Sequence, residues 1–385
     1  MKAIVCTAYG GPDVLKLEEV EQPRPKAGEV LVRVRATTAS RADCEIRRFE
    51  FPAWVWLPVR LAFGVVRPRV RILGQEFAGE VEALGDGVSA FAPGDRVYGT
   101  TGIGLGAYAE FVCAGGRRTG SVVGPMPAAL TYAEAAAVPD GACEALRFLR
   151  KAGVGAGQRV LVIGAGGSFG TCAVQLAKHA GAEVVAVDSA GKLEMLRELG
   201  ADEAIDYTER DFTYGAGDFD IVFDVVGRAP FGRVVRLLRP RGRYVVANPH
   251  TAQLVRGLGA DQVIDYTAQD FADGAGDFDI VFDVIGRAPY GRLVGVLRPG
   301  GRYVVANPHT AQLIRGLWAS LTGDRKMIFS SGAVKDEHLR AVTELVETGA
   351  LRPVIDRRYP LEQMAEAHRY AETEQKLGNI VIVVD

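Results

Sequence analysis

The sequence predicts an α/β protein with two domains, a β-rich domain followed by a doubly wound parallel sheet. Three observations predict this class: a Gly-rich first third with short alternating apolar runs, a middle part in which strand-like and helix-like segments alternate, and a strand-like tail at 379–385. Alternating strands and helices indicate a parallel sheet covered on both faces. We expect 1–125 and 335–385 to form the β-rich domain and 126–334 to form the parallel sheet.

The composition narrows the class of protein. The 385 residues correspond to two or three domains at roughly 150 residues each. Hydrophobic residues make up 48% and charged residues 24%, unlike a disordered chain, and the net charge of −2 argues against a nucleic-acid-binding surface. The five cysteines form no C-x-x-C pair, and neither a secretory segment nor an apolar stretch of about 20 residues is present. We therefore expect a cytoplasmic protein without disulfides, a structural zinc lobe or membrane spans.

Short runs bounded by glycine predict the β-rich domain. Residues 29–40 alternate like a half-buried strand, and GEVEALG, GDRVYGT and GAYAEFVCA follow at close spacing. Between them lies the apolar and basic segment 54–71, with Pro near both ends. We interpret this segment as a loop or short helix over a pocket; a membrane-touching segment is the alternative.

A 59-residue internal repeat changes the number of domains expected from the chain length. Residues 200–258 and 259–317 align without a gap; 13 of the 59 positions differ and 46 are identical. Two copies are fewer than the three or so that a solenoid needs, so we interpret the repeat as a tandem duplication. Without one copy the chain has 326 residues. We expect two domains carrying one extra duplicated β-α-β unit rather than a third domain.

The parallel sheet is predicted element by element. Residues 159–165 form a short apolar run, a Gly-rich turn follows, and GTCAVQLAKHAG has helical spacing. Residues 183–189 are the next strand, and the helix KLEMLRELGA ends at a glycine. AIDY, DIVFDVVG and RYVVANP are further strands, and 336–349 form a last helix.

The Gly-rich turn predicts a dinucleotide site. The turn GAGGSFG contains Gly164, Gly166, Gly167, Ser168, Phe169 and Gly170. Glycine lets the main chain approach a pyrophosphate, and the helix N-terminus offers free N–H groups and a favourable dipole. The spacing departs from the strict G-x-G-x-x-G pattern, but the strand before, the helix after and an acid 18 residues past Gly170 supply the context of a Rossmann unit.

Two residues beyond the turn point to different cofactors. Asp188 ends a predicted strand, where a carboxylate accepts from the ribose hydroxyls and repels a 2′-phosphate, favouring NADH. Lys192 lies four residues later and can pair with that phosphate, or can simply be a solvated residue at a helix start. We lean slightly to NADH and leave NADPH open.

With a β-rich first domain, a Rossmann unit and a returning tail, the chain resembles the medium-chain dehydrogenase/reductase superfamily, within it the zinc-free quinone oxidoreductase and enoyl reductase branch. The matching stretches cover nearly the whole chain apart from one repeat copy: 1–34, ILGQEFAGEVEALGDGVSAFAPGDRVYG, AEAAAVP, RVLVIGAGGSFG, LRELGADEAIDY and GALRPVIDRRYPLEQMAEAHRYAE. The resemblance implies a GroES-like first domain, a Rossmann second domain, a homodimer, and hydride transfer from NADH or NADPH to a quinone or an enone.

The resemblance also implies that no catalytic zinc is bound. The positions that hold zinc in zinc-dependent relatives match Ser40, Gln75 and, in third place, Asp140. Ser and Gln are poor zinc ligands. We therefore expect no metal.

Other positions that approach the cofactor or substrate in the family carry different residues. A Tyr becomes Glu45, a Thr becomes Glu144, and a Lys near the C-terminus becomes Asn379. We hypothesise that Glu45, Glu144 and Asp140 converge with Glu76 as acid–base groups, because crowded carboxylates raise one another's pKa. The alternative is that these acids face water or pair with Arg41 and Arg47.

Both repeat copies carry residues that the family places over the nicotinamide. They are Val226, Gly227, Asn248 and Pro249 in the first copy and Ile285, Gly286, Asn307 and Pro308 in the second. The second copy leads into KMIFSSG, which contains Ser330, and it keeps Gly300 where the first copy has Arg241, a costly residue where φ is positive. We expect the second copy in the pocket and the first extending or flanking the sheet. A split in which only the first copy's initial strand stays in place is the alternative.

Three functions follow from these observations. The first is a zinc-independent NAD(P)H oxidoreductase acting on a quinone or an α,β-unsaturated carbonyl. The second is a family member repurposed for a non-redox cyclisation or isomerisation that uses the acids in the cleft. The third, a non-enzymatic nucleotide- or RNA-binding protein, is disfavoured by the near-neutral charge.

Overall fold

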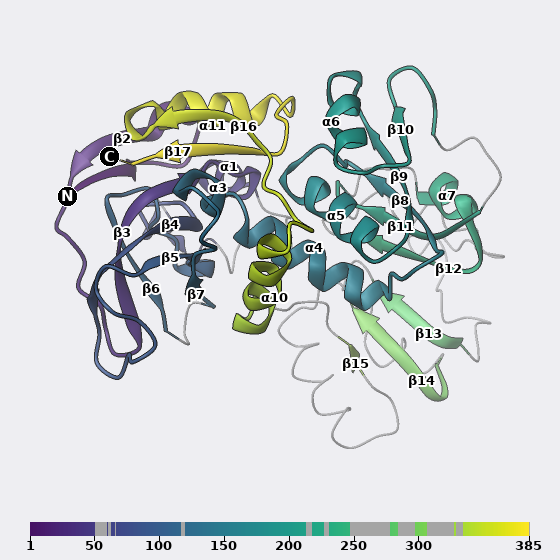
Figure 1. Cartoon of the computed structure of the whole chain (residues 1–385), viewed down its shortest axis with the longest axis horizontal. Helices are drawn as coiled ribbons and strands as arrows, with labels where there is room; N and C mark the ends of the chain where they lie inside the picture. Colours follow the sequence, from purple (N-terminus) through teal and green to yellow (C-terminus); the bar gives the residue numbers. More distant parts are fainter. Residues whose placement is uncertain are drawn as a thin grey trace. The chain divides into compact units, whose positions relative to one another are not determined.

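The computed structural model (Figure 1) divides the chain into two compact units. Unit 1 comprises Met1–Ala229, Arg236–Asn248 and Ala333–Asp385, and unit 2 comprises Pro230–Val235 and Pro249–Gly332. The structure describes residues 1–50, 60, 63–65, 67–116, 120–212, 218–226, 231–246, 278–283, 297–305, 327–328 and 334–384. Half of the predicted loop at 54–71 therefore lies outside the described residues.

A seven-stranded sheet forms the β-rich part of unit 1. Its order is β16-β17-β3-β4-β5-β7, and β6 pairs with β3. The strands are β3 (Glu29–Thr38), β4 (Glu76–Leu84), β5 (Arg96–Thr100), β6 (Phe111–Gly115), β7 (Val122–Pro125), β16 (Ile355–Pro360) and β17 (Asn379–Val383). A separate antiparallel pair is formed by β1 (Lys2–Cys6) and β2 (Leu15–Glu19). Because β17 runs antiparallel to β3, the tail returns to the first domain as the sequence predicts.

The alternation within β3 explains how this sheet holds its core. Val30, Val32 and Val34 are almost fully buried and belong to one apolar cluster with Phe77 of β4 and Met364 of α11 (Met364–Glu372). Each such side chain contributes roughly 1.5–3 kcal/mol by leaving water. The cluster fixes β3, after which the chain enters helix α1 (Arg41–Arg48) at the candidate site.

A five-stranded parallel sheet forms the second part of unit 1, in the order β10-β9-β8-β11-β12. The strands are β8 (Arg159–Ile163), β9 (Glu183–Asp188), β10 (Glu203–Asp206), β11 (Phe219–Asp224) and β12 (Leu238–Val246). Strands β8 and β9 are continuous apolar runs, as expected where both faces of a parallel sheet are covered. The accompanying helices are α3 (Tyr132–Ala136), α4 (Pro139–Ala152), α5 (Ser168–His179), α6 (Leu193–Glu198) and α10 (Asp336–Glu347). The predicted Rossmann sheet is confirmed.

Unit 2 contains a separate three-stranded parallel sheet. Its order is β13-β14-β15, with β13 (Phe278–Asp283), β14 (Leu297–Val305) and β15 (Met327–Ile328). The short helix α7 (Phe231–Val234) also belongs to this unit. All three strands come from the second repeat copy and the segment that follows it.

The structure differs from the expectation that the second copy fills the central sheet. Strand β11 of the first copy pairs with β8, from Ile221 beside Val160 to Asp224 beside Ile163, and β12 follows on its other side. The physical reason is connection length: β11 follows β10 after only the short stretch 207–218, whereas β13 follows β10 after a whole further copy.

Candidate functional site

A tight turn between β8 and α5 forms the centre of the candidate cofactor site. Gly164 has a φ of 76°, in the left-handed region, and a Cβ there would lie 2.3 Å from Val226 Cγ2. At Gly170 a Cβ would lie 2.3 Å from the carbonyl oxygen of Gly164. Both positions therefore need glycine, the first for the turn and the second so that α5 can pack directly against it.

The N-terminus of α5 can be approached by an anion. Gly167 is the N-cap residue, with no side chain to bond the first N–H groups, and a Cβ there would meet only the Gly164 carbonyl oxygen at 4.0 Å. The first turn of α5 holds no acidic residue. Phe169 anchors this turn to the core by ring contacts with Phe148 and Phe223. An uncapped helix N-terminus on a rigid base fits the pyrophosphate of a dinucleotide.

Asp188 and Lys192 lie beside this turn and pair with each other. Asp188 Oδ2 accepts from the Gly166 N–H at 2.7 Å, and Oδ1 lies 3.0 Å from Lys192 Nζ. Both side chains are only 9% exposed. A Cβ on Gly166 would lie 2.4 Å from Lys192 Cδ, so this glycine makes room for the lysine. The two residues that favour different cofactors thus form one buried ion pair.

Lys376 is a cation at the turn that the sequence analysis missed. Its Nζ donates to Ser168 Oγ at 2.6 Å and to the Gly378 carbonyl oxygen. Burial, and next the charge of Lys192, lowers the pKa of Lys376 to about 8. No sequence signal could have revealed it, because Lys376 and Ser168 are 208 positions apart.

Two carboxyl groups meet where β4 and α4 begin. Glu76 is 4% exposed, and its Oε1 accepts from the Asp140 N–H at 2.9 Å while Thr38 Oγ1 donates to its Oε2. Burial, followed by the Asp140 charge, raises the pKa of Glu76. Burial also raises the pKa of Asp140, and the charges of Asp43 and Glu144 act in the same direction. Such a pair can retain a proton close to neutral pH.

Asp43 is a second residue that the sequence analysis missed. It is fully buried, and its Oδ2 accepts from Ser40 Oγ at 2.6 Å and from the Ser40 N–H at 3.1 Å, a reciprocal cap of helix α1. Its Oδ1 accepts from the Gly74 N–H at 3.2 Å. The pattern Ser-x-x-Asp after a strand is the available signal. Asp43 thereby ties α1 to the segment that contains Gln75.

The other predicted acids have arginine partners. Glu45 forms an ion pair with Arg41 at 2.9 Å, and Glu144 pairs with Arg147. Glu144 is close enough to Asp140 for its charge to raise the Asp140 pKa. The structure therefore brings Glu76, Asp140 and Glu144 into one electrostatic group, while Glu45 is engaged by Arg41.

The residues at the zinc positions of the family have other roles. Ser40 Oγ caps α1, and Gln75 Nε2 donates to the Gly102 carbonyl oxygen at 3.3 Å. Asn379, where the family has Lys, donates to the carbonyl oxygens of Ala137 and Val354, both at 3.1 Å. Within the described ranges, no three His, Cys, Asp or Glu side chains form a group that could hold a metal ion.

The remaining predicted cofactor residues lie outside the described residues. They are Ile285, Gly286, Asn307, Pro308 and Ser330 of the second copy and its following strand, as well as Gly227, Asn248 and Pro249 of the first copy. Val226 of the first copy is described, and its side chain is the one that lies against Gly164.

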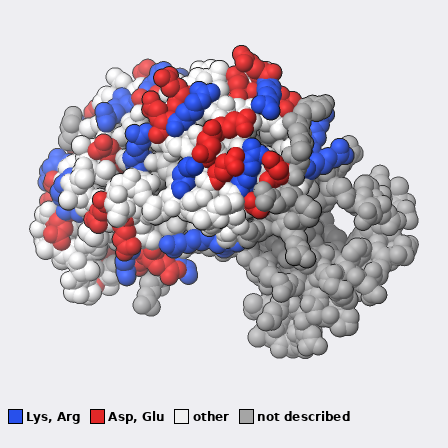
Figure 2. Space-filling model, turned by 45° about the vertical axis from the view of Figure 1, so that its right-hand side comes forward, with Lys and Arg blue, Asp and Glu red and all other residues white. Residues whose placement is uncertain are grey.

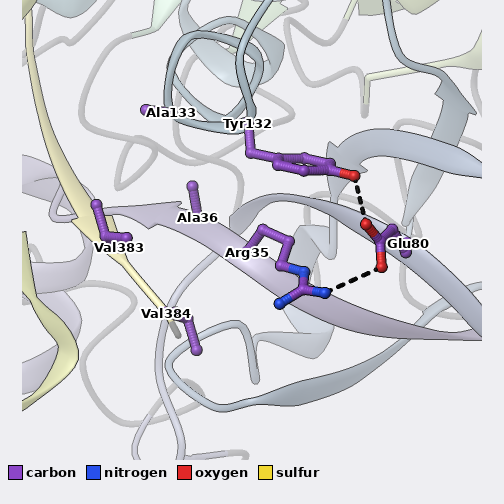
Figure 3. Close-up of a pocket in the computed structure, with 7 residues that line it drawn as sticks. All are labelled: Arg35, Ala36, Glu80, Tyr132, Ala133, Val383 and Val384. Carbon is purple, nitrogen blue, oxygen red and sulfur yellow. Dashed lines mark hydrogen bonds and ion pairs between the residues drawn. The ribbon is translucent and has the colours of Figure 1, made fainter.

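A surface pocket of about 390 Å³ lies elsewhere on unit 1 (Figure 3). Glu80 of β4 accepts from Tyr132 Oη at 2.7 Å and pairs with Arg35 of β3 at 3.2 Å, so its charge is already balanced. Figure 2 shows Lys and Arg interspersed with Asp and Glu over the described part of one face, without a basic stripe. None of the helices within the described residues combines the length and apolar composition of a membrane span.

Comparison with known proteins finds the same two-domain organisation. Family models match at 26–147 (alcohol dehydrogenase GroES-like domain) and at 169–247 and 258–382 (zinc-binding dehydrogenase in both cases). A 2-methylene-furan-3-one reductase of Solanum lycopersicum is 29% identical over 99% of this chain and 79% of its own length. A mitochondrial NAD(P)H oxidoreductase of Mus musculus is 30% identical over 100% of this chain and 89% of its own.

A solved structure extends this similarity to the fold. The quinone oxidoreductase from Coxiella burnetii superposes with a TM-score of 0.68 at 25% identity, covering 100% of this chain and 99% of that one. These relatives are named as reductases and oxidoreductases, and they give no support to the non-redox alternative.

Proposed function

Because the chain belongs to the medium-chain dehydrogenase/reductase superfamily, we propose that it is a zinc-independent, NAD(P)H-dependent oxidoreductase that reduces a quinone or an α,β-unsaturated carbonyl. The observation that carries the proposal is the turn between β8 and α5, with its open helix N-terminus and two neighbouring lysines. Relatives named as a furanone reductase, an NAD(P)H oxidoreductase and a quinone oxidoreductase support this reaction class.

The direct test is cofactor oxidation. The purified chain is mixed with NADH or NADPH and with panels of quinones and enones, and the loss of nicotinamide absorbance is followed. We expect turnover with at least one acceptor. Binding of the cofactor is measured separately by its fluorescence, so that a protein that binds NADH or NADPH but reduces nothing would contradict the reaction while leaving the cofactor site in place.

The cofactor phosphates would be held by the N–H groups at the start of α5 together with Ser168 and Lys376. Lys376 already donates to Ser168 Oγ at 2.6 Å, which places a cation at the dipole's positive end. Lys192 and Lys376 both lie at this helix N-terminus, where Asp188 pairs with Lys192 and the charges of Glu76 and Asp356 act on Lys376. The two ammonium groups and the helix dipole together favour a ligand with several negative charges.

Asp188 supports NADH and Lys192 supports NADPH. Their ion pair at 3.0 Å reduces the repulsion that Asp188 alone would exert on a 2′-phosphate. We retain a slight preference for NADH, because Asp188 is the residue positioned at the end of β9 and tied to the Gly166 N–H. NADPH is expected to bind as well, with Lys192 turning to its phosphate.

When bound, the nicotinamide supplies the hydride, which adds to the β-carbon of an enone or to a quinone while the electron pair moves to the carbonyl oxygen. The product then needs one proton. The Glu76–Asp140 pair can hold that proton near neutral pH, because burial raises the pKa of both carboxyl groups and the Asp140 charge raises that of Glu76 further. We assign the catalytic acid role to Asp140, with Glu144 and Glu45 as the other polar groups near the acceptor.

A reaction without zinc agrees with the donor chemistry of the site. Ser40 Oγ donates to Asp43, and the Gln75 amide donates to Gly102. Neither a hydroxyl nor an amide is a ligand that Zn²⁺ prefers. Metal content of the purified protein, measured by elemental mass spectrometry, tests this point, and stoichiometric zinc would overturn it.

The nicotinamide end of the cofactor would contact one repeat copy. Val226 of the first copy lies against Gly164, so the first copy is the one placed at the turn. Ile285, Gly286, Asn307, Pro308 and Ser330 stay proposed contacts for an arrangement in which the second copy occupies that place. The protein is further proposed to be a cytoplasmic homodimer, which sedimentation and cell fractionation would test.

A further inference from the structure

The two repeat copies build the same strand pair. Strands β11 and β13 share the sequence FDIVFD, and β12 and β14 differ only where Arg241 is replaced by Gly300. Their registers are identical as well. Phe219 lies beside Leu238 and, after a bulge, Ile221 beside Arg243; in the second copy Phe278 lies beside Leu297 and, after the same bulge, Ile280 beside Arg302. Each copy is therefore a complete parallel pair with equal pairing capacity.

Among the described residues, each pair has one edge paired with a further strand and the other edge open. In the first copy β11 pairs with β8, whereas β12 is the last strand of its sheet among the described residues. In the second copy β14 pairs with β15, with Tyr303 beside Met327, whereas β13 is the last strand on its side. The open edge of β13 has the same sequence as the edge of β11 that bonds β8. Tyr244 on the open edge of β12 is the equivalent of Tyr303, through which β14 pairs with β15.

We propose that the place beside β8 is a strand-binding site for which the two copies of this chain compete. In one arrangement the central sheet ends β8-β11-β12, and in the other it continues β8-β13-β14-β15. The exchange keeps the main-chain hydrogen bonds to β8, because the strand that leaves and the strand that enters have the same six residues.

Two opposing effects keep both arrangements within reach. The loop between β10 and the incoming strand is 207–218 for the first copy and 207–277 for the second, and the entropy of loop closure favours the shorter loop by about tenfold. The second copy lets β15 extend the central sheet, because β14 already pairs with β15.

The exchange alters the wall of the candidate cofactor site. In the first arrangement Val226 lies against the Gly164 turn. A Cβ added at Gly164 would lie 2.3 Å from Val226 Cγ2. The matching residue of the second copy is Ile285, which carries one more methylene. The two arrangements therefore present two slightly different surfaces at the same turn.

A pair of matched substitutions tests the competition. Phe223 is fully buried in β11 and contacts Phe148 and Phe169, so Phe223→Asp places a carboxylate in the core. Phe282→Asp is the matched change in β13. We expect each single variant to fold, with melting temperatures within a few degrees of one another, because the intact copy takes the place beside β8. We expect the double variant to lose cooperative unfolding.

Hydrogen exchange identifies the copy in use. Peptides that contain 219–226 and 278–285 differ in mass because Val226 is replaced by Ile285. In Phe223→Asp we expect slow amide exchange at 278–283 and fast exchange at 219–224, and the reverse in Phe282→Asp. The proposal is overturned if Phe223→Asp alone unfolds the protein as completely as the double variant. It is equally overturned if a folded Phe223→Asp variant shows no gain of protection in β13.

Discussion

The ammonium group of Lys376 lies at the candidate cofactor site and changes its ionisation near neutral pH. Its pKa is lowered to about 8 by burial and then by Lys192, so it is charged at pH 7 and largely neutral at pH 9. Because the charged form is the one that attracts phosphate, we expect the Kd for NADH to rise several-fold between pH 7 and pH 9. A cofactor fluorescence titration across this range measures it.

Two variants serve as controls for Lys376. Lys376→Arg keeps its charge at pH 9, so its Kd should stay nearly constant over the range. Lys376→Met should weaken cofactor binding roughly tenfold at pH 7, because one charge-assisted hydrogen bond to the cofactor is lost. A Met variant that binds as tightly as the unmodified protein, with the same pH profile, would show that Lys376 does not contact the cofactor.

Asp188 and Lys192 give a prediction about cofactor choice. Asp188→Asn removes the carboxylate that repels a 2′-phosphate and frees Lys192, so NADPH affinity should rise several-fold while NADH affinity falls. Lys192→Met should lower the affinity for NADPH more than that for NADH. Calorimetric titration of each variant with both cofactors measures the ratio, and equal effects on the two cofactors would refute the assignment.

At the level of elements, the turn between β8 and α5 sets how closely the helix packs. A methyl group on Gly170 would lie 2.3 Å from the Gly164 carbonyl oxygen and 2.6 Å from Ala165 Cα, both main-chain atoms that cannot turn away. Gly170→Ala should therefore destabilise the protein by about 1–3 kcal/mol, as overpacking does. Chemical denaturation measures this change.

Gly191 supplies the matched control for Gly170. A Cβ there would meet nothing within 4 Å, and the residue lies in the short turn before α6. Gly191→Ala should leave the free energy of unfolding nearly unchanged. A Gly170→Ala variant as stable as Gly191→Ala would mean that α5 can shift away from the turn at little cost.

The elements that the sequence predicts well are those set by local patterns. The strand at 159–165, the glycine turn and the following helix depend on neighbouring residues, and each is observed as β8, the turn and α5. Lys376 escaped prediction because its contact with Ser168 depends on how β17 returns. The prediction that the second copy lies beside β8 was wrong, because Gly300 lies within β14 rather than in a turn and the shorter connection from β10 favours β11 there.

For the whole molecule, the repeat predicts that the chain can be shortened. Deleting 259–317 leaves 326 residues, in which β12 leads through 247–258 and 318–326 to β15. Because β12 matches β14, we expect Tyr244 to take the place of Tyr303 beside Met327 and to extend one continuous sheet. Thermal unfolding should then occur at a temperature no lower than that of the full chain.

Deleting 200–258 instead provides the comparison for this shortening. The two products differ only at the 13 positions where the copies differ, so their melting temperatures should agree within a few degrees. If both shortened chains aggregate while the full chain is folded, the extra copy is an essential part of the fold and the tandem-duplication interpretation fails.

The main-chain bond from the Gly378 N–H to the Gly166 carbonyl oxygen, at 2.9 Å, has a consequence for observing this protein at work. It joins the glycine turn to the start of β17 through main-chain atoms alone, so among ordinary substitutions only proline at position 378 removes its donor. Further along β17, the Ile380 carbonyl oxygen accepts from the Ala39 N–H, immediately before α1. The Gly378 amide can therefore report on the cofactor site. We expect its NMR resonance to shift when a cofactor binds at the glycine turn. The Ala39 amide, next to Ser40, should shift as well if the change extends along β17.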